Sequence, residues 1–263
     1  MGLVDGNVLV TGATGGIGQA ITRAFAARGA TLLLSGRRAD VLEPLAEETG
    51  GRALVCDLAS RSDVNRLIVE VGEVDVLVAN AALPASGSLL DYEQQAIDRA
   101  IEVNLRAPIA LARGLAPAMV QRGRGHLVFI SSLSGKAASP ASSLYSATKF
   151  GLRGFALSLR EDLRGADVGV SVVLPGFIRH AGMFADSGAC LPVGVGTRTP
   201  EQVAAAVIEA IERDRAEVDV APRAMRIGAA LAGVAPELSA AVSRRLGSHK
   251  IAAVVAGGQR EKR

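Results

Sequence analysis

Two side chains with complementary chemistry, Tyr145 and Lys149, stand four residues apart in the sequence. On a helix this spacing places the phenol and the ammonium group on one face. A neighbouring cation favours the phenolate, so we expect Lys149 to lower the pKa of Tyr145 from its ordinary value near ~10. A phenol tuned in this way can donate or accept a proton in catalysis. A purely structural helix contact is the alternative, and the rest of the chain decides between them.

A glycine-rich segment near the start of the chain supplies that context. Residues 8–10 are apolar and typical of a buried strand, and apolar residues recur at helical spacing from Ala20 to Ala27. Between them, residues 11–18 carry glycines in the pattern Gly-x-x-x-Gly-x-Gly. Such a turn brings the backbone close to a pyrophosphate, whose charge is stabilised by N–H groups at the helix start. The segment predicts a dinucleotide site, with an ordinary strand-to-helix turn as the alternative.

The end of the second predicted strand indicates which dinucleotide is bound. Folds that bind NAD place an acidic residue there, against the ribose 2′-hydroxyl. This chain has Gly36 at that position, followed by Arg37 and Arg38. The missing carboxylate removes repulsion toward a 2′-phosphate, and two guanidinium groups supply charge-assisted donors for it. We therefore predict NADP(H) as the cofactor, with a solvated arginine pair as the alternative.

With these features the chain resembles the short-chain dehydrogenase/reductase family from about residue 5 to about residue 220. The family's glycine motif, Thr-Gly-x-x-x-Gly-x-Gly, matches residues 11–18, and its adenine-side aspartate matches Asp57. Its Asn-Asn-Ala-Gly motif matches residues 79–82 imperfectly, because two of the four positions carry other small residues. We expect the tight turn to survive, with less backbone freedom than glycine gives.

Four side chains match the family's catalytic set in order and spacing, namely Asn104, Ser132, Tyr145 and Lys149. The resemblance implies that Tyr145 exchanges a proton with the substrate and that Ser132 holds the substrate oxygen. It also implies that Lys149 hydrogen-bonds the nicotinamide ribose and that Asn104 positions a water that relays protons to Lys149. No metal is needed in this scheme.

The Pro-Gly motif of the family matches Pro175 and Gly176, after the sixth predicted strand. Many members place a threonine that binds the nicotinamide carboxamide five residues after the proline, where this chain has His180. The resemblance still lets Ile178 reach the carboxamide through its backbone. His180 either bonds the carboxamide or substrate, or is an ordinary loop histidine, and we favour the latter.

The resemblance implies a full set of residues in contact with the cofactor. They are Gly12, Thr14, Gly15, Gly16, Ile17, Gly18, Arg37, Arg38, Asp57, Leu58, Asn80, Ala81, Tyr145, Lys149, Pro175, Gly176 and Ile178. The implied activity is an NADP(H)-dependent interconversion of a secondary alcohol and a ketone.

Small and apolar residues expected around the cleft favour an apolar substrate; they are Ala81, Ala82, Leu83, Leu133, Phe177 and Met183. A noncatalytic NADP-sensing or scaffold protein is one alternative to this enzyme. A nucleotide-sugar epimerase or dehydratase is another, although such chains usually run longer.

Strands and helices alternate along the chain, which predicts an α/β fold with a doubly wound parallel sheet of about seven strands, the Rossmann fold. The strands are expected near residues 8–11, 31–35, 52–56, 74–79, 125–131, 168–174 and 217–220. Residues 1–222 should form the NAD(P)-binding catalytic domain, and residues 223–263 a helical extension with a basic tail. In that extension we expect two short helices, at 224–231 and 236–246. Residues 181–199 are either a mobile substrate lid or a passive loop.

The composition excludes several classes of protein. The two cysteines, Cys56 and Cys190, are far apart and there is no Cys/His cluster, so neither a disulfide framework nor zinc is expected. No secretory signal or run of 18 apolar residues is recognised, and a reduced, cytoplasmic setting follows. The net charge of +3 arises from residues 241–263, and aromatic residues make up only 3% of the chain, which argues against nucleic-acid binding.

The expected partners are a small alcohol or ketone and further copies of the chain. Family members usually pair through two helices, here about 98–122 and 143–165, so a homodimer or homotetramer is predicted. We expect Leu152, Phe155 and Leu159 on the outer face of the second helix; the alternative is that they face their own sheet. For residues 223–247 we favour packing over the substrate cleft or a subunit contact, with contact to an anionic membrane as the alternative. For the basic tail, too, a solvated or subunit-packing role is favoured over weak membrane contact.

Overall fold

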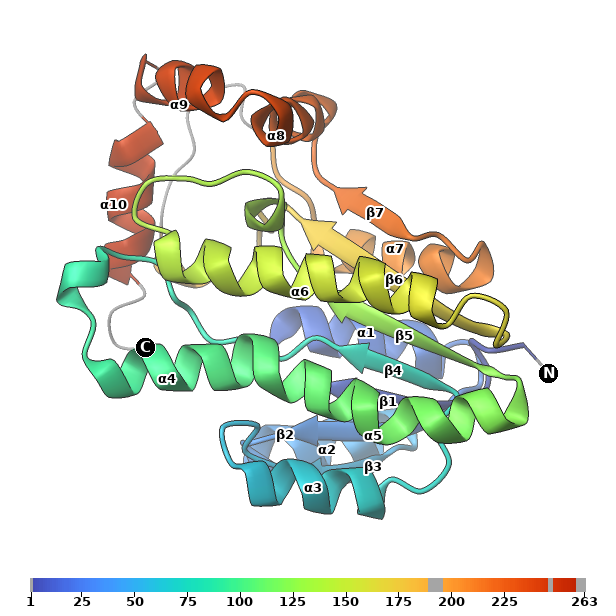
Figure 1. Cartoon of the computed structure of the whole chain (residues 1–263). Helices are drawn as coiled ribbons and strands as arrows, with labels where there is room; N and C mark the ends of the chain where they lie inside the picture. Colours follow the sequence, from blue (N-terminus) through green and yellow to red (C-terminus); the bar gives the residue numbers. More distant parts are fainter. Residues whose placement is uncertain (1, 189–195, 246–247, 259–263) are drawn as a thin grey trace.

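The computed structural model describes residues 2–188, 196–245 and 248–258, in which one parallel sheet has the strand order β3-β2-β1-β4-β5-β6-β7 (Figure 1). The strands are β1 (Asn7–Thr11), β2 (Thr31–Gly36), β3 (Arg52–Val55), β4 (Val76–Ala79), β5 (Gly125–Ile130), β6 (Val168–Pro175) and β7 (Glu217–Val220). The strand order reverses direction between β1 and β4, as in a doubly wound fold. The predicted fold class is confirmed.

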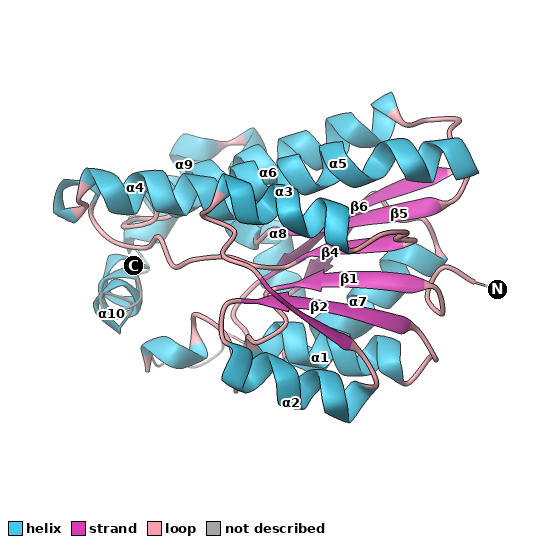
Figure 2. Cartoon of the chain, turned by 90° about the horizontal axis from the view of Figure 1, so that it is seen from below, coloured by secondary structure: helices cyan, strands magenta, loops and turns pink. Residues whose placement is uncertain are grey.

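Helices cover both faces of the sheet (Figure 2). One layer consists of α1 (Gly16–Ala26), α2 (Ala39–Thr49) and α7 (Pro200–Glu212). The other consists of α3 (Arg61–Glu70), α5 (Ala107–Arg122) and α6 (Ser143–Asp162). The helix α4 (Gln94–Ile101) continues into α5 through a π-helical turn at Glu102–Arg106.

The first strand shows why the sequence forms this sandwich. Val8, Leu9 and Val10 are all fully buried. Leu9 packs in the core beneath α3, α5 and α6, whereas Val8 and Val10 pack in the core beneath α1, α2 and α7. A strand that is covered on both faces needs an uninterrupted apolar run, which explains why apolar and polar residues do not alternate in β1.

The extension after β7 forms three helices, α8 (Arg223–Val234), α9 (Pro236–Arg245) and α10 (Ser248–Gly258). They lie beyond the carboxyl ends of the strands (Figure 1). The first of the two predicted helices, at 224–231, is shorter than the observed α8. Helix α8 continues through Gly233 and ends at Val234, because Pro236 disfavours a helical conformation at Ala235. The prediction also lacks α10, because the sequence reading treated that segment as a tail.

Hydrogen bonds between Thr199 and Gln202 fix the start of α7. The Thr199 side chain accepts a hydrogen bond from the Gln202 N–H, and the Gln202 side chain accepts one from the Thr199 N–H, which is a capping box. Of the predicted lid, residues 189–195 lie outside the described residues. The described part before them contains the short 3₁₀ helix η4 (Ala185–Ser187).

The prediction for the outer face of α6 is wrong for the residues it named. Leu152 is 1% exposed, and both Phe155 and Leu159 pack against the core of their own subunit. The ring of Phe155 stands edge-on to Phe129 of β5, with 5.5 Å between centroids. Helical spacing identifies which side chains share a face but does not say whether that face meets the sheet or solvent.

Candidate active site

A cavity of about 1420 Å³ lies at the carboxyl ends of the strands. Open parallel sheets bind ligands at this edge, at the point where the strand order reverses. Every predicted site residue except Asn104 lines this cavity. The six small or apolar residues predicted around the substrate line it as well.

The glycine loop fits a pyrophosphate. Gly12 has a φ of +64°, and a Cβ there would lie 2.7 Å from the Cα of Ala81, so only glycine allows the loops after β1 and β4 to meet. Gly15 is the N-cap of α1 and makes no side-chain cap. The N–H groups of the first helical turn therefore lack a side-chain acceptor, at a cavity edge where the helix dipole favours an anion.

Asn80 and Thr11 hold the two loops together. The Asn80 side chain donates hydrogen bonds to the main-chain oxygens of Thr11 and Gly12, at 3.0 and 3.1 Å. The Thr11 hydroxyl in turn accepts from the N–H groups of Asn80 and Ala81, at 3.1 and 3.3 Å. These contacts explain how the turn keeps its shape with alanines in place of the family's residues. The sequence reading gave Thr11 no such role.

Asn104 lies beneath the cavity wall rather than on it. Its side chain is fully buried in the π-helical turn. The amide oxygen accepts a 2.6 Å hydrogen bond from the Leu83 N–H, and the amide nitrogen donates a 2.9 Å bond to the Leu83 oxygen. The side chain thus positions the loop after β4 and does not line the cavity, so the water-holding role of Asn104 stays a prediction.

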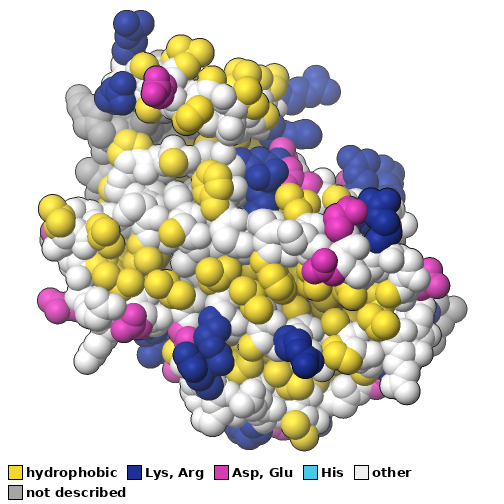
Figure 3. Space-filling view, in the orientation of Figure 1, with side chains coloured by type: hydrophobic (Ala, Val, Ile, Leu, Met, Phe, Trp, Pro, Cys, Tyr) yellow, Lys and Arg dark blue, Asp and Glu magenta, His cyan; other side chains and the backbone are white. Residues whose placement is uncertain are grey.

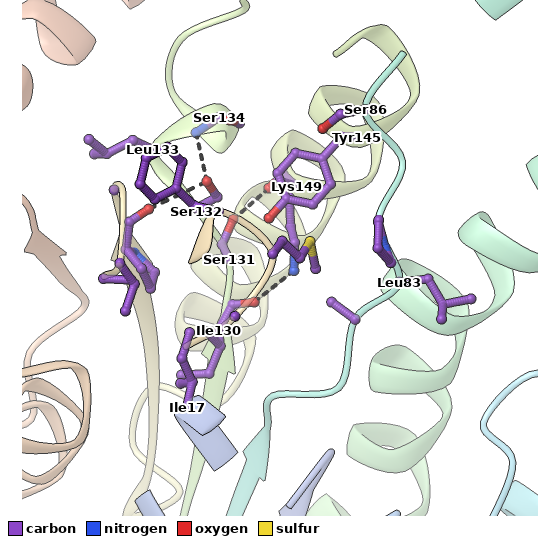
Figure 4. A pocket seen from close by; sticks show the side chains of 18 of the residues that line it. Ile17, Leu83, Ser86, Ile130, Ser131, Ser132, Leu133, Ser134, Tyr145 and Lys149 are labelled. Carbon is purple, nitrogen blue, oxygen red and sulfur yellow. Dashed lines mark hydrogen bonds between the residues drawn. The ribbon is translucent and has the colours of Figure 1, made fainter. Parts of the chain in front are cut away.

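Ser132, Tyr145 and Lys149 meet at one wall of the cavity (Figure 4). Ser132 follows β5 and its hydroxyl accepts a 3.1 Å bond from the Ser134 N–H, which holds the short 3₁₀ helix η3 (Leu133–Gly135). Tyr145 and Lys149 lie in α6, with the Lys149 ammonium 5.7 Å from the centre of the Tyr145 ring. The ring and the Ser132 hydroxyl point toward the same space (Figure 4).

The predicted direction of the Tyr145 pKa shift is wrong in this structure. Burial raises the pKa of Tyr145 to about 12, and a hydrogen bond with Ser132 offsets only part of that effect. Burial also lowers the pKa of Lys149 to about 8. Spacing alone predicted the cation's effect but could not show that both groups lose water, which disfavours both charged forms. Tyr145 therefore holds its proton at neutral pH.

The arginine pair lies at the far end of the cavity. Arg38 donates a 2.8 Å hydrogen bond to the Thr14 oxygen of the glycine loop, and Arg37 is exposed. A Cβ on Gly36 would lie 2.8 Å from the Thr14 side chain, so an acidic residue would not fit there without movement. Asp57, predicted on the adenine side, forms a 3.1 Å ion pair with Arg99.

The sequence named none of the cavity residues that come from the C-terminal helices, although packing over the cleft was one role expected for residues 223–247. The C-terminal helices contribute Met225, Leu231, Leu238, Val242, Ala252 and Val255. The segment after β6 lies against the glycine loop, as shown by the Ala181 methyl, with which a Cβ on Gly16 would collide. His180 is exposed, has a φ of +69° and is absent from the cavity wall, as expected for a loop histidine.

The described residues hold no group of His, Cys, Asp and Glu side chains placed to bind a metal ion. Cys56 is buried and unpaired, and Cys190 lies outside the described residues. None of the helices in the described part of the chain is long and apolar enough to cross a membrane.

The sequence profile described as "short chain dehydrogenase" matches residues 6–190. The chain belongs to this family. A curated short-chain dehydrogenase relative, the "Ketoacyl reductase HetN" of Nostoc sp., is 36% identical over 227 residues, covering 83% of this chain and 79% of that protein. The "Dehydrogenase/reductase SDR family member 7B" of Xenopus laevis is 33% identical and covers 88% of this chain and 78% of its own.

Solved short-chain dehydrogenases share the fold. A metagenomic short-chain oxidoreductase in complex with NADP is 34% identical, with a TM-score of 0.70, and covers 82% of this chain and 97% of its own. A short-chain dehydrogenase from Sphingobium yanoikuyae in complex with NADPH is 29% identical, with a TM-score of 0.75, and covers 89% and 95%. The family uses a nicotinamide cofactor, which agrees with the dinucleotide prediction.

Proposed function

We propose that this short-chain dehydrogenase interconverts a secondary alcohol and a ketone of an apolar substrate with NADP(H), using Tyr145 as general acid and base. The observation that carries the proposal is the position of Tyr145 beside Ser132 and Lys149 on the wall of a cavity that also contains the glycine loop. The relative described as a ketoacyl reductase supports a carbonyl substrate.

The residues at the cofactor end favour a phosphorylated dinucleotide. The uncapped start of α1 would hold the pyrophosphate, and Arg37 and Arg38 would face the 2′-phosphate. When bound, NADP(H) supplies or accepts the hydride. The two relatives solved with NADP and NADPH support this choice.

The residues at the catalytic wall handle the proton. Tyr145 keeps its proton at neutral pH, so it can donate that proton to a carbonyl oxygen during reduction and would recover one from the alcohol during oxidation. The Ser132 hydroxyl would hold the same oxygen and stabilise charge that develops on it. The ammonium group of Lys149 is held by the Ile130 oxygen and supplies positive charge behind the tyrosine.

The test is a screen of apolar ketones and secondary alcohols with NADPH and NADP⁺, followed by absorbance of the reduced nicotinamide. We expect turnover of apolar ketones that depends on Tyr145. Tight NADPH binding without turnover of any carbonyl or alcohol would instead support a noncatalytic NADP sensor.

The proposal also includes assembly into a homo-oligomer and a location in the cytoplasm.

A further inference from the structure

Exposed apolar side chains gather on the C-terminal helices. Among the described residues, six of the large hydrophobic side chains classed as exposed lie there: Ile227, Leu231, Val234, Leu238, Val242 and Val254. Figure 3 shows hydrophobic side chains over α8 and α9, with Lys and Arg side chains on either side. Such a concentration marks an interaction surface rather than scattered surface residues.

The residues on α8 and α9 recur at helical spacing, so that each helix carries one apolar stripe with an arginine at one end. On α8, Ile227, Leu231 and Val234 follow Arg223 at intervals of four, four and three residues. On α9, Leu238 and Val242 precede Arg245 at intervals of four and three. These intervals place each arginine on the same helix face as its apolar stripe. We call the five apolar residues and two arginines the α8–α9 face.

We propose that the α8–α9 face binds an anionic lipid surface, with the two helices lying in the plane of that surface. Aliphatic side chains flanked by arginines match the boundary between acyl chains and anionic headgroups, because an arginine extends its charge to the headgroups while its stem remains apolar. From residue 223 to residue 245 the chain carries four arginines and one glutamate.

The cavity favours this occupant over a second copy of the chain. Leu231, Leu238 and Val242 line the cavity although they are 60%, 67% and 47% exposed, so they stand at its mouth. A subunit seated on this face would cover the mouth. A lipid surface would instead place the mouth against the phase in which apolar molecules dissolve.

Membrane contact was an alternative both for the basic tail and for residues 223–247, and the structure favours the second segment. In α10, Ala252 and Val255 line the cavity and Ala256 is buried, whereas Val254 is 53% exposed. The lipid-facing residues are therefore on α8 and α9, for which the sequence favoured packing over the cleft or a subunit contact.

Vesicle co-sedimentation of the full chain tests the proposal. With vesicles of equal phosphatidylglycerol and phosphatidylcholine, we expect a partition coefficient at least about ten-fold higher than with phosphatidylcholine alone. The double variant Ile227→Gln, Val234→Gln should lose about ten-fold or more of that binding. Neither residue lines the cavity, and glutamine keeps the helix propensity high, so NADPH binding and thermal unfolding should not change.

Two further variants test whether vesicle binding depends on the apolar stripes and arginines of the α8–α9 face rather than on exposed apolar side chains in general. Val69→Gln removes an equally exposed apolar side chain from α3, where Val69 is 82% exposed, and should leave vesicle binding unchanged. Arg223→Gln with Arg245→Gln should weaken binding to the anionic vesicles by roughly 25-fold, or about five-fold for each arginine.

Several outcomes would overturn the proposal. These are no vesicle binding, equal binding to both vesicle types, or binding that survives the Ile227→Gln, Val234→Gln variant. Loss of binding on removal of residues 259–263 alone would assign it to the tail. An oligomer that this same double variant dissociates in sedimentation velocity would assign the face to a second copy of the chain.

Discussion

The main-chain oxygen of Ile130 accepts a 2.9 Å hydrogen bond from the buried ammonium group of Lys149. Ile130 is the last residue of β5, and Lys149 lies in the helix that follows. The bond fixes the ammonium group at the carboxyl edge of the sheet, beneath the Tyr145 ring. Burying that cation is unfavourable, which is why the pKa of Lys149 falls to about 8.

Lys149→Met should therefore separate stability from activity. The lowered Lys149 pKa, from 10.5 to about 8, corresponds to about 3 kcal/mol against the folded state at neutral pH, a penalty that fades as pH rises from about 8 to 10.5. We expect Lys149→Met to keep or raise the unfolding temperature while turnover falls at least ~100-fold. Thermal melts and initial rates measure both, and a strongly destabilised variant would contradict this account.

Tyr145→Phe should abolish most turnover and leave cofactor binding intact. The change removes the exchangeable proton but little volume, so we expect kcat to fall by roughly 100-fold or more. The matched control is Tyr92→Phe, because Tyr92 does not line the cavity and its hydroxyl donates a hydrogen bond to the Ser86 main-chain oxygen. Unchanged turnover in Tyr145→Phe would reject the proposed proton transfer.

Arg37→Ala with Arg38→Ala should erase the preference for NADP(H). A hydrogen bond between charged groups contributes about 1.5–3 kcal/mol, so the NADPH affinity should fall at least about ten-fold while the NADH affinity changes little. Arg28→Ala is the control, because Arg28 also bonds a main-chain oxygen but lies away from the cavity. Equal affinity of the unaltered protein for both cofactors would show that the assignment is wrong.

His126 should make the protein sensitive to acid. Its ring nitrogen lies 2.7 Å from the Ser171 hydroxyl, and burial lowers the pKa of His126 to about 4. The unfolded chain therefore binds the extra proton first as pH falls from about 6.5 to 4, and the free energy of unfolding should drop by about 3 kcal/mol over that window. Urea titrations at several pH values measure the drop. His126→Gln should reduce it, and an equally steep loss in that variant would contradict the assignment.

A subunit contact through α5 and α6 would use residues other than those the sequence named. Val120 and Phe150 are 39% and 41% exposed, and Figure 3 shows hydrophobic side chains gathered over these helices. Val120→Glu with Phe150→Glu should convert the expected homodimer or homotetramer into smaller species in sedimentation. A protein that is already monomeric at micromolar concentration would remove the basis for this prediction.

The sequence predicted the sheet and the cavity well because both depend on local patterns. Most strands are short apolar runs, and many of the residues that line the cavity follow strand ends, which the parallel order of the strands brings to one edge of the sheet. The Tyr145 pKa was mispredicted because desolvation depends on the whole surroundings of the ring. Phe155 was misplaced for a similar reason, since its spacing does not identify its packing partner.

The C-terminal wall of the cavity was predicted only in part, because the sequence allowed residues 223–247 to cover the cleft but gave α10 no such role. Val255 belongs to an apolar run that reads equally well as an anchor, a subunit contact or a core segment. Only the path of the chain through α8 and α9 brings it back over the cleft. The sequence did not predict the role of Thr11 either, because the two N–H groups that donate hydrogen bonds to its hydroxyl lie about 70 residues further along the chain.

The contact between Gly16 and Ala181 has a kinetic consequence. The Ala181 methyl occupies the space that a side chain at position 16 would need, and Gly182 lies beside Ile17. The segment that follows the Pro-Gly turn is thus packed on the loop expected to hold the pyrophosphate. We expect exchange of the dinucleotide to require this segment to lift, so that the rate of cofactor release would depend on the opening of the substrate side. Such coupling would give ordered kinetics, with the dinucleotide first to enter and last to leave.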